Sequence, residues 1–122
     1  MAVYTTIDDP SAYFQTTLYT GNGSTNAITN SGNSDLQPDW VWIKKRSATE
    51  NHALYDSVRG TTKTLYSNLT EAEYTESTSL TAFGSDGFTL GADGIVNANT
   101  GTYVSWNWKE SATAGFDIVS YT

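Results

Sequence analysis

The sequence predicts an all-β fold, an antiparallel two-sheet sandwich of jelly-roll or lectin-like type with at most one short helix. The composition is the first indication, with 4 Trp, 8 Tyr and 10 Gly among 122 residues. Aromatic and β-branched residues fit a pleated sheet, and the usual helix formers are too sparse for long helices. The second indication is the spacing, because short β-favouring runs alternate with turn residues along the whole chain.

Polar turns divide the first third of the chain into two strands. Residues 12–20 form a β-favouring run that closes on Tyr-Thr and predict the first strand. Residues 21–24, Gly-Asn-Gly-Ser, tolerate positive φ and predict a tight reversal. We expect the second strand at residues 25–29, followed by a polar loop over residues 30–35.

The middle of the chain contains its most apolar strand. Pro38 delays the start of this strand because proline cannot donate a ladder hydrogen bond. Residues 40–43, Trp-Val-Trp-Ile, are apolar on both faces, which predicts a strand in the middle of a sheet that is covered on both sides. Weaker strands are expected at residues 52–58 and 64–67.

One short helix is expected, over residues 70–74. Thr70 and Glu73 have the spacing of a capping box, in which the side chain of each residue accepts a hydrogen bond from the backbone N–H of the other. Two Asp-Gly pairs, at 86–87 and 93–94, predict type I′ hairpin turns. These turns separate three brief strands at 80–83, 88–90 and 95–96.

The last predicted strand spans residues 104–109. Val104, Trp106 and Trp108 share one face, and the residues between them are polar, which is the alternation of a half-buried strand. We expect Trp106 and Trp108 to be mostly buried in the core. We expect core packing for Trp40 and Trp42 as well.

The end of the chain repeats its beginning. Residues 115–122 (GFDIVSYT) echo residues 13–20 (YFQTTLYT). We interpret residues 1–11 as an N-terminal arm, 12–112 as the sandwich domain and 113–122 as the start of a second β repeat in a tandem protein. The alternative is that short Tyr- and Thr-rich strands resemble one another by chance or pair within one sheet.

Composition argues against several classes of function. A net charge of -7 with only 6 Lys and Arg residues provides no sustained basic surface, so nucleic acid and anionic membranes are not expected as partners. The absence of Cys removes disulfides, thiolate nucleophiles and thiolate metal sites. No apolar run is long enough for membrane insertion, and the first residues lack the pattern of a signal peptide, so synthesis in a cytoplasm is expected.

Two groups of residues are candidates for binding. The four Trp side chains could form a platform for sugar rings, although core packing is the favoured interpretation. Asp56 and Arg59 stand three apart at a strand end. Their ion pair could fix the Arg-Gly turn, which we favour, or Arg59 could meet a ligand carboxylate.

No catalytic residue, metal site or cofactor is predicted. His52 is the only histidine and cannot form a cluster by itself, so we expect a surface or half-buried position for it. The Glu71, Glu73 and Glu76 group is expected on a solvated turn rather than in a tuned catalytic pair. Oxygen ligands for Ca²⁺ could come from four residues, but they do not form a calcium-loop motif. These residues are Asp86, Asp93, Asn97 and Asn99.

Five sequence blocks follow one another in a fixed order, at residues 18–23, 37–44, 56–60, 83–91 and 103–109. Together they resemble a family of functionally uncharacterised β domains in bacteriophage virion proteins. Such domains occur in many marine and cyanobacterial phages, often in tandem and often within tail-fibre or other structural proteins. The resemblance covers most of residues 13–110, and residues 4–11 resemble the N-termini of such phage proteins. It implies a virion setting and a lectin-like sandwich, and it carries over no site residue.

The sequence therefore predicts a non-enzymatic structural module of a phage virion, in a fibre or appendage that attaches to the particle by its N-terminal part. Tyr4 and Ile7 are the expected anchors of the arm, which can add a strand to a sheet edge of another virion subunit. The expected partners are other virion subunits, including further copies of the chain, with a trimer as one arrangement. The first alternative function is a carbohydrate-binding module that contacts a glycan on the host surface, and the second is a glycan-cleaving enzyme.

Overall fold

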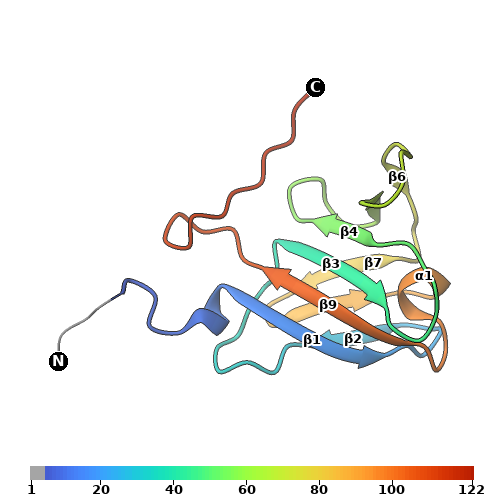
Figure 1. Ribbon diagram of the computed structural model, residues 1–122, viewed down its shortest axis with the longest axis horizontal. Coiled ribbons are helices and arrows are strands. Elements are labelled where there is room, and N and C mark those ends of the chain that lie inside the picture. Colours follow the sequence, from blue (N-terminus) through green and yellow to red (C-terminus); the bar gives the residue numbers. More distant parts are fainter. Residues whose placement is uncertain (1–4) are drawn as a thin grey trace.

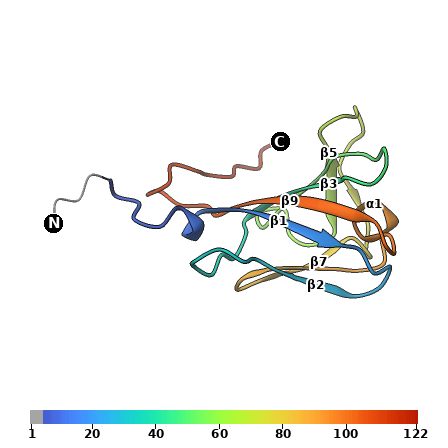
Figure 2. The ribbon, with the colours of Figure 1, turned by 60° about the horizontal axis from the view of Figure 1, so that its bottom comes forward.

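The computed structural model describes residues 5–122 as two antiparallel β-sheets packed face to face (Figure 1). The larger sheet has six strands in the order β1-β9-β3-β4-β5-β6, and the smaller has three in the order β2-β8-β7. Viewed from the side, β2 and β7 form a separate layer beneath β1 and β9 (Figure 2). The predicted all-β sandwich with one short α-helix is therefore confirmed. The strands are β1 (Phe14–Thr20), β2 (Asn26–Thr29), β3 (Trp40–Lys45), β4 (Ala53–Asp56), β5 (Lys63–Tyr66), β6 (Tyr74–Thr75), β7 (Leu80–Gly84), β8 (Gly87–Leu90) and β9 (Thr102–Trp108).

The hydrophobic core fills the space between the two sheets. β3 lies inside the larger sheet, between β9 and β4, as its apolar sequence predicts. Its Val41 and Ile43 point inward and are fully buried, as are Tyr55 of β4 and Tyr103 of β9. The smaller sheet faces them with Ile28, Leu80, Phe88 and Leu90.

The β7–β8 hairpin forms as predicted, with its turn one residue earlier than expected. Gly84 pairs with Gly87, so Ser85 and Asp86 form the turn and Gly87 begins β8. Gly87 has a φ of 130°, which L side chains rarely adopt. A Cβ at this position would lie 1.9 Å from the carbonyl oxygen of Ile28, so glycine is required for β2 to pair with β8.

The predicted helix at residues 70–74 is wrong. Tyr74 instead belongs to β6, where it pairs with Thr64 of β5, and Glu73 forms an ion pair with Arg59. The strand expected at residues 95–96 is wrong too, because α1 (Gly94–Asn97) occupies this segment. Asp93 caps the helix by accepting a hydrogen bond from the backbone N–H of Ile95 at 2.9 Å, and the Asp-Gly pair starts a helix there rather than a hairpin.

The N-terminal arm is tied to the domain at Asp9. Its carboxylate accepts hydrogen bonds from Ser11, Asn33 and Ser34, and it caps the short 3₁₀ helix η1 (Pro10–Ala12). These hydrogen bonds hold the pKa of Asp9 well below its usual range. Ile7 is half-buried, and Tyr4 lies outside the described residues. Residues 9–11 thus contact the domain itself, whereas the predicted docking of the arm on another subunit stays a prediction.

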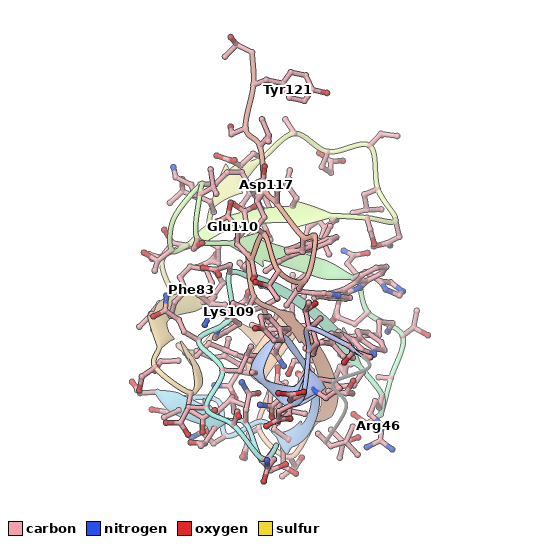
Figure 3. The ribbon with its side chains drawn as sticks, turned by 90° about the vertical axis from the view of Figure 1, so that its left-hand side faces the viewer. Arg46, Phe83, Lys109, Glu110, Asp117 and Tyr121 are labelled. Carbon is pink, nitrogen blue, oxygen red and sulfur yellow. The ribbon has the colours of Figure 1, made fainter. Side chains whose placement is uncertain are left out.

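The C-terminal segment, residues 109–122, leaves β9, turns back so that Phe116 stacks on Trp40 and Trp108, and then runs past the ends of β3 and β4 with its end pointing away from the sheets (Figure 1). An isolated bridge between Ser111 and Phe116 is its only β pairing within residues 5–122. Glu110 and Asp117 lie close together where the segment turns back, and Tyr121 projects from the body of the molecule (Figure 3). The segment forms no full strand here, and its interpretation as the start of a second repeat stays a prediction.

Candidate functional site: an aromatic face and the C-terminal segment

All four Trp residues lie on the outer face of the larger sheet. Trp40 and Trp42 of β3 point away from buried Val41 and Ile43, and Trp106 and Trp108 of β9 point away from buried Tyr103. All four indoles are half-buried. The predicted alternation is correct and the indoles are mostly covered, as expected, but they lie on the outer face and not in the core between the two sheets. We call this surface, with Phe14, Trp40, Trp42, Trp106 and Trp108, the aromatic face.

On the core-facing side of β9, the Ser105 hydroxyl and the Asn107 side-chain NH₂ have hydrogen-bond partners, whereas the Asn107 side-chain oxygen has none within residues 5–122. The Asn107 side-chain amide donates to the carbonyl of Gln15 at 3.2 Å, and the Ser105 hydroxyl donates to the carbonyl of Thr17 at 3.4 Å. Thr17 in turn donates to the side-chain carbonyl of buried Asn30 at 2.8 Å. Buried polar groups with partners are tolerated, so alternation alone could not identify the inner face of β9.

Strand register places the aromatic rings in rows across the sheet. Trp40 is opposite Trp108, and their stacked ring centroids are 5.1 Å apart, while Phe14 meets Trp108 at 5.0 Å. Trp42 is opposite Trp106, and these rings meet edge to face at 5.8 Å. Such geometries are favourable for aromatic pairs beyond the area that they bury.

His52 orients Trp42. The indole N–H of Trp42 donates to Nδ1 of His52 at 3.1 Å, and the two rings are 5.7 Å apart. His52 is half-buried beside the start of β4, which confirms the position expected for it. This contact satisfies the only polar atom of the Trp42 side chain and fixes the ring on the aromatic face.

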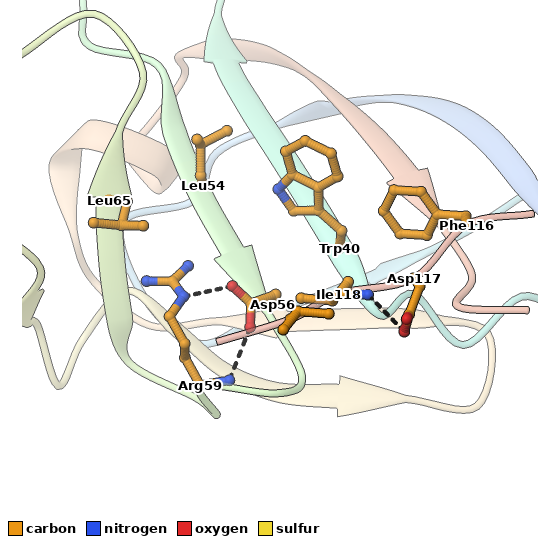
Figure 4. Close-up of a pocket in the computed structure, with 9 residues that line it drawn as sticks. Trp40, Leu54, Asp56, Arg59, Leu65, Phe116, Asp117 and Ile118 are labelled. Carbon is orange, nitrogen blue, oxygen red and sulfur yellow. Dashed lines mark hydrogen bonds and ion pairs between the residues drawn. The ribbon is translucent and has the colours of Figure 1, made fainter. Parts of the chain in front are cut away.

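The C-terminal segment covers one end of the aromatic face. Phe116 stacks on Trp40 at 5.7 Å and on Trp108 at 6.3 Å. Beyond it, Ile118 and Val119 lie over Leu54 and Leu65, where a cleft of about 270 Å³ remains between the segment and the sheet (Figure 4). The segment therefore rests on the sheet through few side chains and leaves open space beneath it.

Asp56 and Arg59, both predicted from the sequence, line this cleft. The Asp56 carboxylate accepts a hydrogen bond from the backbone N–H of Arg59 at 2.8 Å and pairs with the Arg59 Nε (Figure 4). Arg59 also reaches the Glu73 carboxylate, at 3.2 Å. These bonds close the turn that ends β4, which is the structural role that the sequence favours. The guanidinium is thereby engaged with two carboxylates of the chain itself.

A second groove remains open on the aromatic face. It is lined by Trp42, Trp106 and Trp108 and has a volume of about 260 Å³. Leu18 of β1, which is 61% exposed, points to the same side of the sheet. This groove corresponds to the Trp platform that the sequence suggests as an alternative, whereas the favoured interpretation assigns the Trp side chains to the core.

Two acidic side chains interact where the C-terminal segment turns back. A hydrogen bond between the Glu110 and Asp117 carboxyl groups raises the pKa of Glu110. The Glu110 backbone N–H donates to the Asp39 carboxylate at 2.8 Å. The turn therefore brings the carboxyl groups of Glu110, Asp117 and Asp39 close together, which favours the protonated form of Glu110.

Three of the four residues considered for Ca²⁺ make structural hydrogen bonds, and the fourth, Asn99, is exposed. Asp86 accepts a hydrogen bond from the backbone N–H of Leu36, and Asp93 caps α1. The buried Asn97 side-chain amide donates to the side-chain carbonyl of Asn22 and to the backbone carbonyl of Gly91. Within residues 5–122, no three His, Asp or Glu side chains gather where they could hold a metal ion. Neither helix in this part of the chain is long and apolar enough to cross a membrane.

Comparison with known proteins identifies a family and no function. No curated protein matches the chain, and no solved structure matches it. The model of one family, described as a domain of unknown function, matches residues 9–122 and so includes the C-terminal segment. The chain therefore belongs to the family DUF7483.

Proposed function

We propose that this chain is a non-enzymatic structural module of a bacteriophage virion, part of a fibre or appendage that binds other virion subunits. The observation that carries the proposal is the aromatic face, a set of large apolar side chains on the outside of a sheet, only partly covered by the C-terminal segment. Exposed apolar surfaces of this kind mark interaction sites on soluble proteins. The sequence blocks that resemble phage virion domains supply the virion setting, which rests on analogy.

The cleft beside Asp56 supports a non-enzymatic role. Arg59 is bonded to Asp56 and Glu73, and the third charged group of the lining, Asp117, is hydrogen-bonded to Glu110. The remaining lining is mainly aliphatic and aromatic. A general acid or base needs a titrating group placed against a substrate, and this cleft offers contact area instead.

Attachment through the N-terminal arm can be tested in particles. A phage that lacks the gene is complemented with the full chain, with a chain lacking residues 2–8, or with Tyr4 and Ile7 both replaced by Ala. Asp9 and its bonds to the domain are retained in every variant. We expect the full chain in purified particles and both altered chains to be absent from them, although all three have the same melting temperature.

The matched control replaces Thr5 and Thr6 with Ala, which changes the arm but keeps its two apolar anchors. This variant should enter particles normally. Absence of the full chain from purified particles would refute the virion role. Normal incorporation of the chain without residues 2–8 would refute only the docking role of the arm.

A carbohydrate-binding module is the second candidate, and the open groove favours it. Flat indole rings can cover the apolar face of a sugar ring, and three of them line this groove. The purified protein should then bind a defined class of glycan on an array, and Trp106→Ala should abolish binding. Tyr121→Ala, which removes an aromatic side chain outside the groove, should not. If the purified protein binds no class of glycan on the array, the carbohydrate-binding function is refuted and the structural role alone remains.

A further inference from the structure

The attachment of the C-terminal segment to its own domain is slight. Two backbone hydrogen bonds between Ser111 and Phe116 close the turn, and no hydrogen bond joins residues 119–122 to any other described residue. The cleft of about 270 Å³ shows that Ile118 and Val119 do not pack closely on Leu54 and Leu65. A segment held in this way can leave and rebind without breaking the sandwich.

Large apolar side chains remain uncovered on the segment and on the sheet beside it. Val119 is 73% exposed and Tyr121 is 91% exposed. Leu18 and Phe14, on the outer side of β1, are 61% and 40% exposed, and they lie on the same side of the sheet as the open Trp groove. The contacts made within one chain therefore cover only part of the apolar surface that the segment and the aromatic face present.

We propose that two copies of this chain associate through their aromatic faces and exchange residues 116–122, so that each C-terminal segment lies in the cleft of the other copy. Phe116 then stacks on the partner's Trp40 and the partner's Trp108, and Ile118 lies over the partner's Leu54. The occupant is identified by the structure, because the same segment already fits this cleft within one chain. The arrangement is isologous, since each copy gives and receives the same segment.

In the closed form, residues 116–122 lie on their own domain, and in the exchanged form they lie on the other copy. The segment makes the same contacts in both, so these contacts do not favour either form. Gly115, with a φ of 72°, stands just before the segment in an exposed turn and can change conformation at little cost. The balance is set by the new interface, which covers Leu18 and the groove lined by Trp42 and Trp106.

Single cysteines provide the test, because the chain contains no Cys of its own. Leu65 and Val119 line the same clefts, so Leu65→Cys and Val119→Cys are made as separate proteins of different tag length. The two proteins are mixed, incubated and treated with a short bismaleimide. Exchange predicts a covalent heterodimer and a particle of twice the monomer mass by light scattering.

Controls separate exchange from other contacts. Ala82→Cys places the thiol on the exposed side of β7 in the smaller sheet and should give no cross-link with Val119→Cys. Leu18→Asp in both proteins should strongly reduce the heterodimer without changing the fold, because Leu18 is exposed in the monomer. A monomeric mixture without the cross-link, or a dimer that lacks it, would overturn the proposal. The proposal concerns the purified chain, so its failure would leave the virion role untouched.

Discussion

The two faces of the larger sheet differ in a way that hydrophobicity does not predict. The inner face of β9 carries Ser105 and Asn107, both fully buried, whereas its outer face carries Trp106 and Trp108, both half-buried. The inner polar groups bond to β1, and the outer rings stack on one another. The side of a strand that is buried therefore depends on the contacts available to its side chains. A polar side chain that makes a hydrogen bond can lie in the core, and an aromatic side chain that stacks on neighbouring rings can lie outside it.

The largest effect is expected from apolar side chains on the inner face. Ile43→Ala should lower the free energy of unfolding by about 2–5 kcal/mol, because it leaves a cavity beside fully buried neighbours. Leu18→Ala is the matched outer-face control and, at concentrations where the chain is monomeric, should change stability by less than about 0.5 kcal/mol. Urea unfolding of both variants measures the difference. Equal losses would mean that the outer face is covered as fully as the core.

A hydrogen bond on the inner face should contribute nearly as much. Thr17→Val keeps the shape of the side chain but removes the donor to Asn30, whose buried oxygen loses this partner. The expected loss is about 1–3 kcal/mol. Thr16→Val, one residue away on the exposed outer side of β1, should be neutral in the same unfolding experiment. If both variants are neutral, hydrogen bonding does not explain the polar side of the core.

A Trp residue on the outer face should cost less than its size suggests. Trp106→Ala removes a half-buried indole and its edge-to-face contact with Trp42, for an expected loss of about 1–2 kcal/mol. Thermal and chemical unfolding measure this loss. A value near that of Ile43→Ala would place Trp106 within the core and contradict the distinction between the two faces.

The smallest effect concerns pH and the C-terminal segment. The pKa of Glu110 is raised by its hydrogen bond to Asp117, and the Asp39 carboxylate also faces it. An acid with a raised pKa in the folded state stabilises this turn fully below its unfolded pKa of about 4.3, and the contribution is lost as pH rises through the folded value. Hydrogen exchange at the Phe116 and Ile118 amides should therefore show less protection as pH rises through this range, after correction for the intrinsic rate.

Glu110→Gln should abolish this pH dependence, because the amide cannot titrate. Glu71→Gln, at an exposed position in the loop before β6, should keep it. Unchanged pH dependence in Glu110→Gln would assign the effect to another acid.

Much of the fold could be predicted from the sequence, and its errors have physical causes. Strand positions follow from β-favouring runs and turn residues, as at β2, where 25–29 was expected and Asn26–Thr29 is found. The helix prediction at Thr70 was wrong because Tyr74 gains a strand partner in Thr64, a contact distant in sequence. The pair Asp93-Gly94 suits both a hairpin turn and the start of a helix. The helix forms here, and it places Val96 in the hydrophobic core.

The candidate site could be predicted only in part. Asp56 and Arg59 were identified because their spacing suits a turn, and the structure places both beside the cleft. The aromatic face is only the less favoured interpretation of the sequence, as a Trp platform, because the pattern shows that Trp106 and Trp108 share a side but not whether that side faces the other sheet. The C-terminal segment covers part of that side, with Phe116 stacked on Trp40 and Trp108, and its single β pairing within residues 5–122 joins Phe116 to Ser111.

The gathering of all four Trp residues on one surface has a spectroscopic consequence. Intrinsic fluorescence of this protein comes mainly from indoles that lie outside the hydrophobic core, so its emission reports the surroundings of the aromatic face. Release of Phe116 from Trp40, or arrival of a ligand in the open groove, should shift the emission while the sandwich stays folded. Circular dichroism of the backbone would remain constant over the same change. An optical probe of this surface is thus already present in the natural chain, and no label is needed to follow its occupancy.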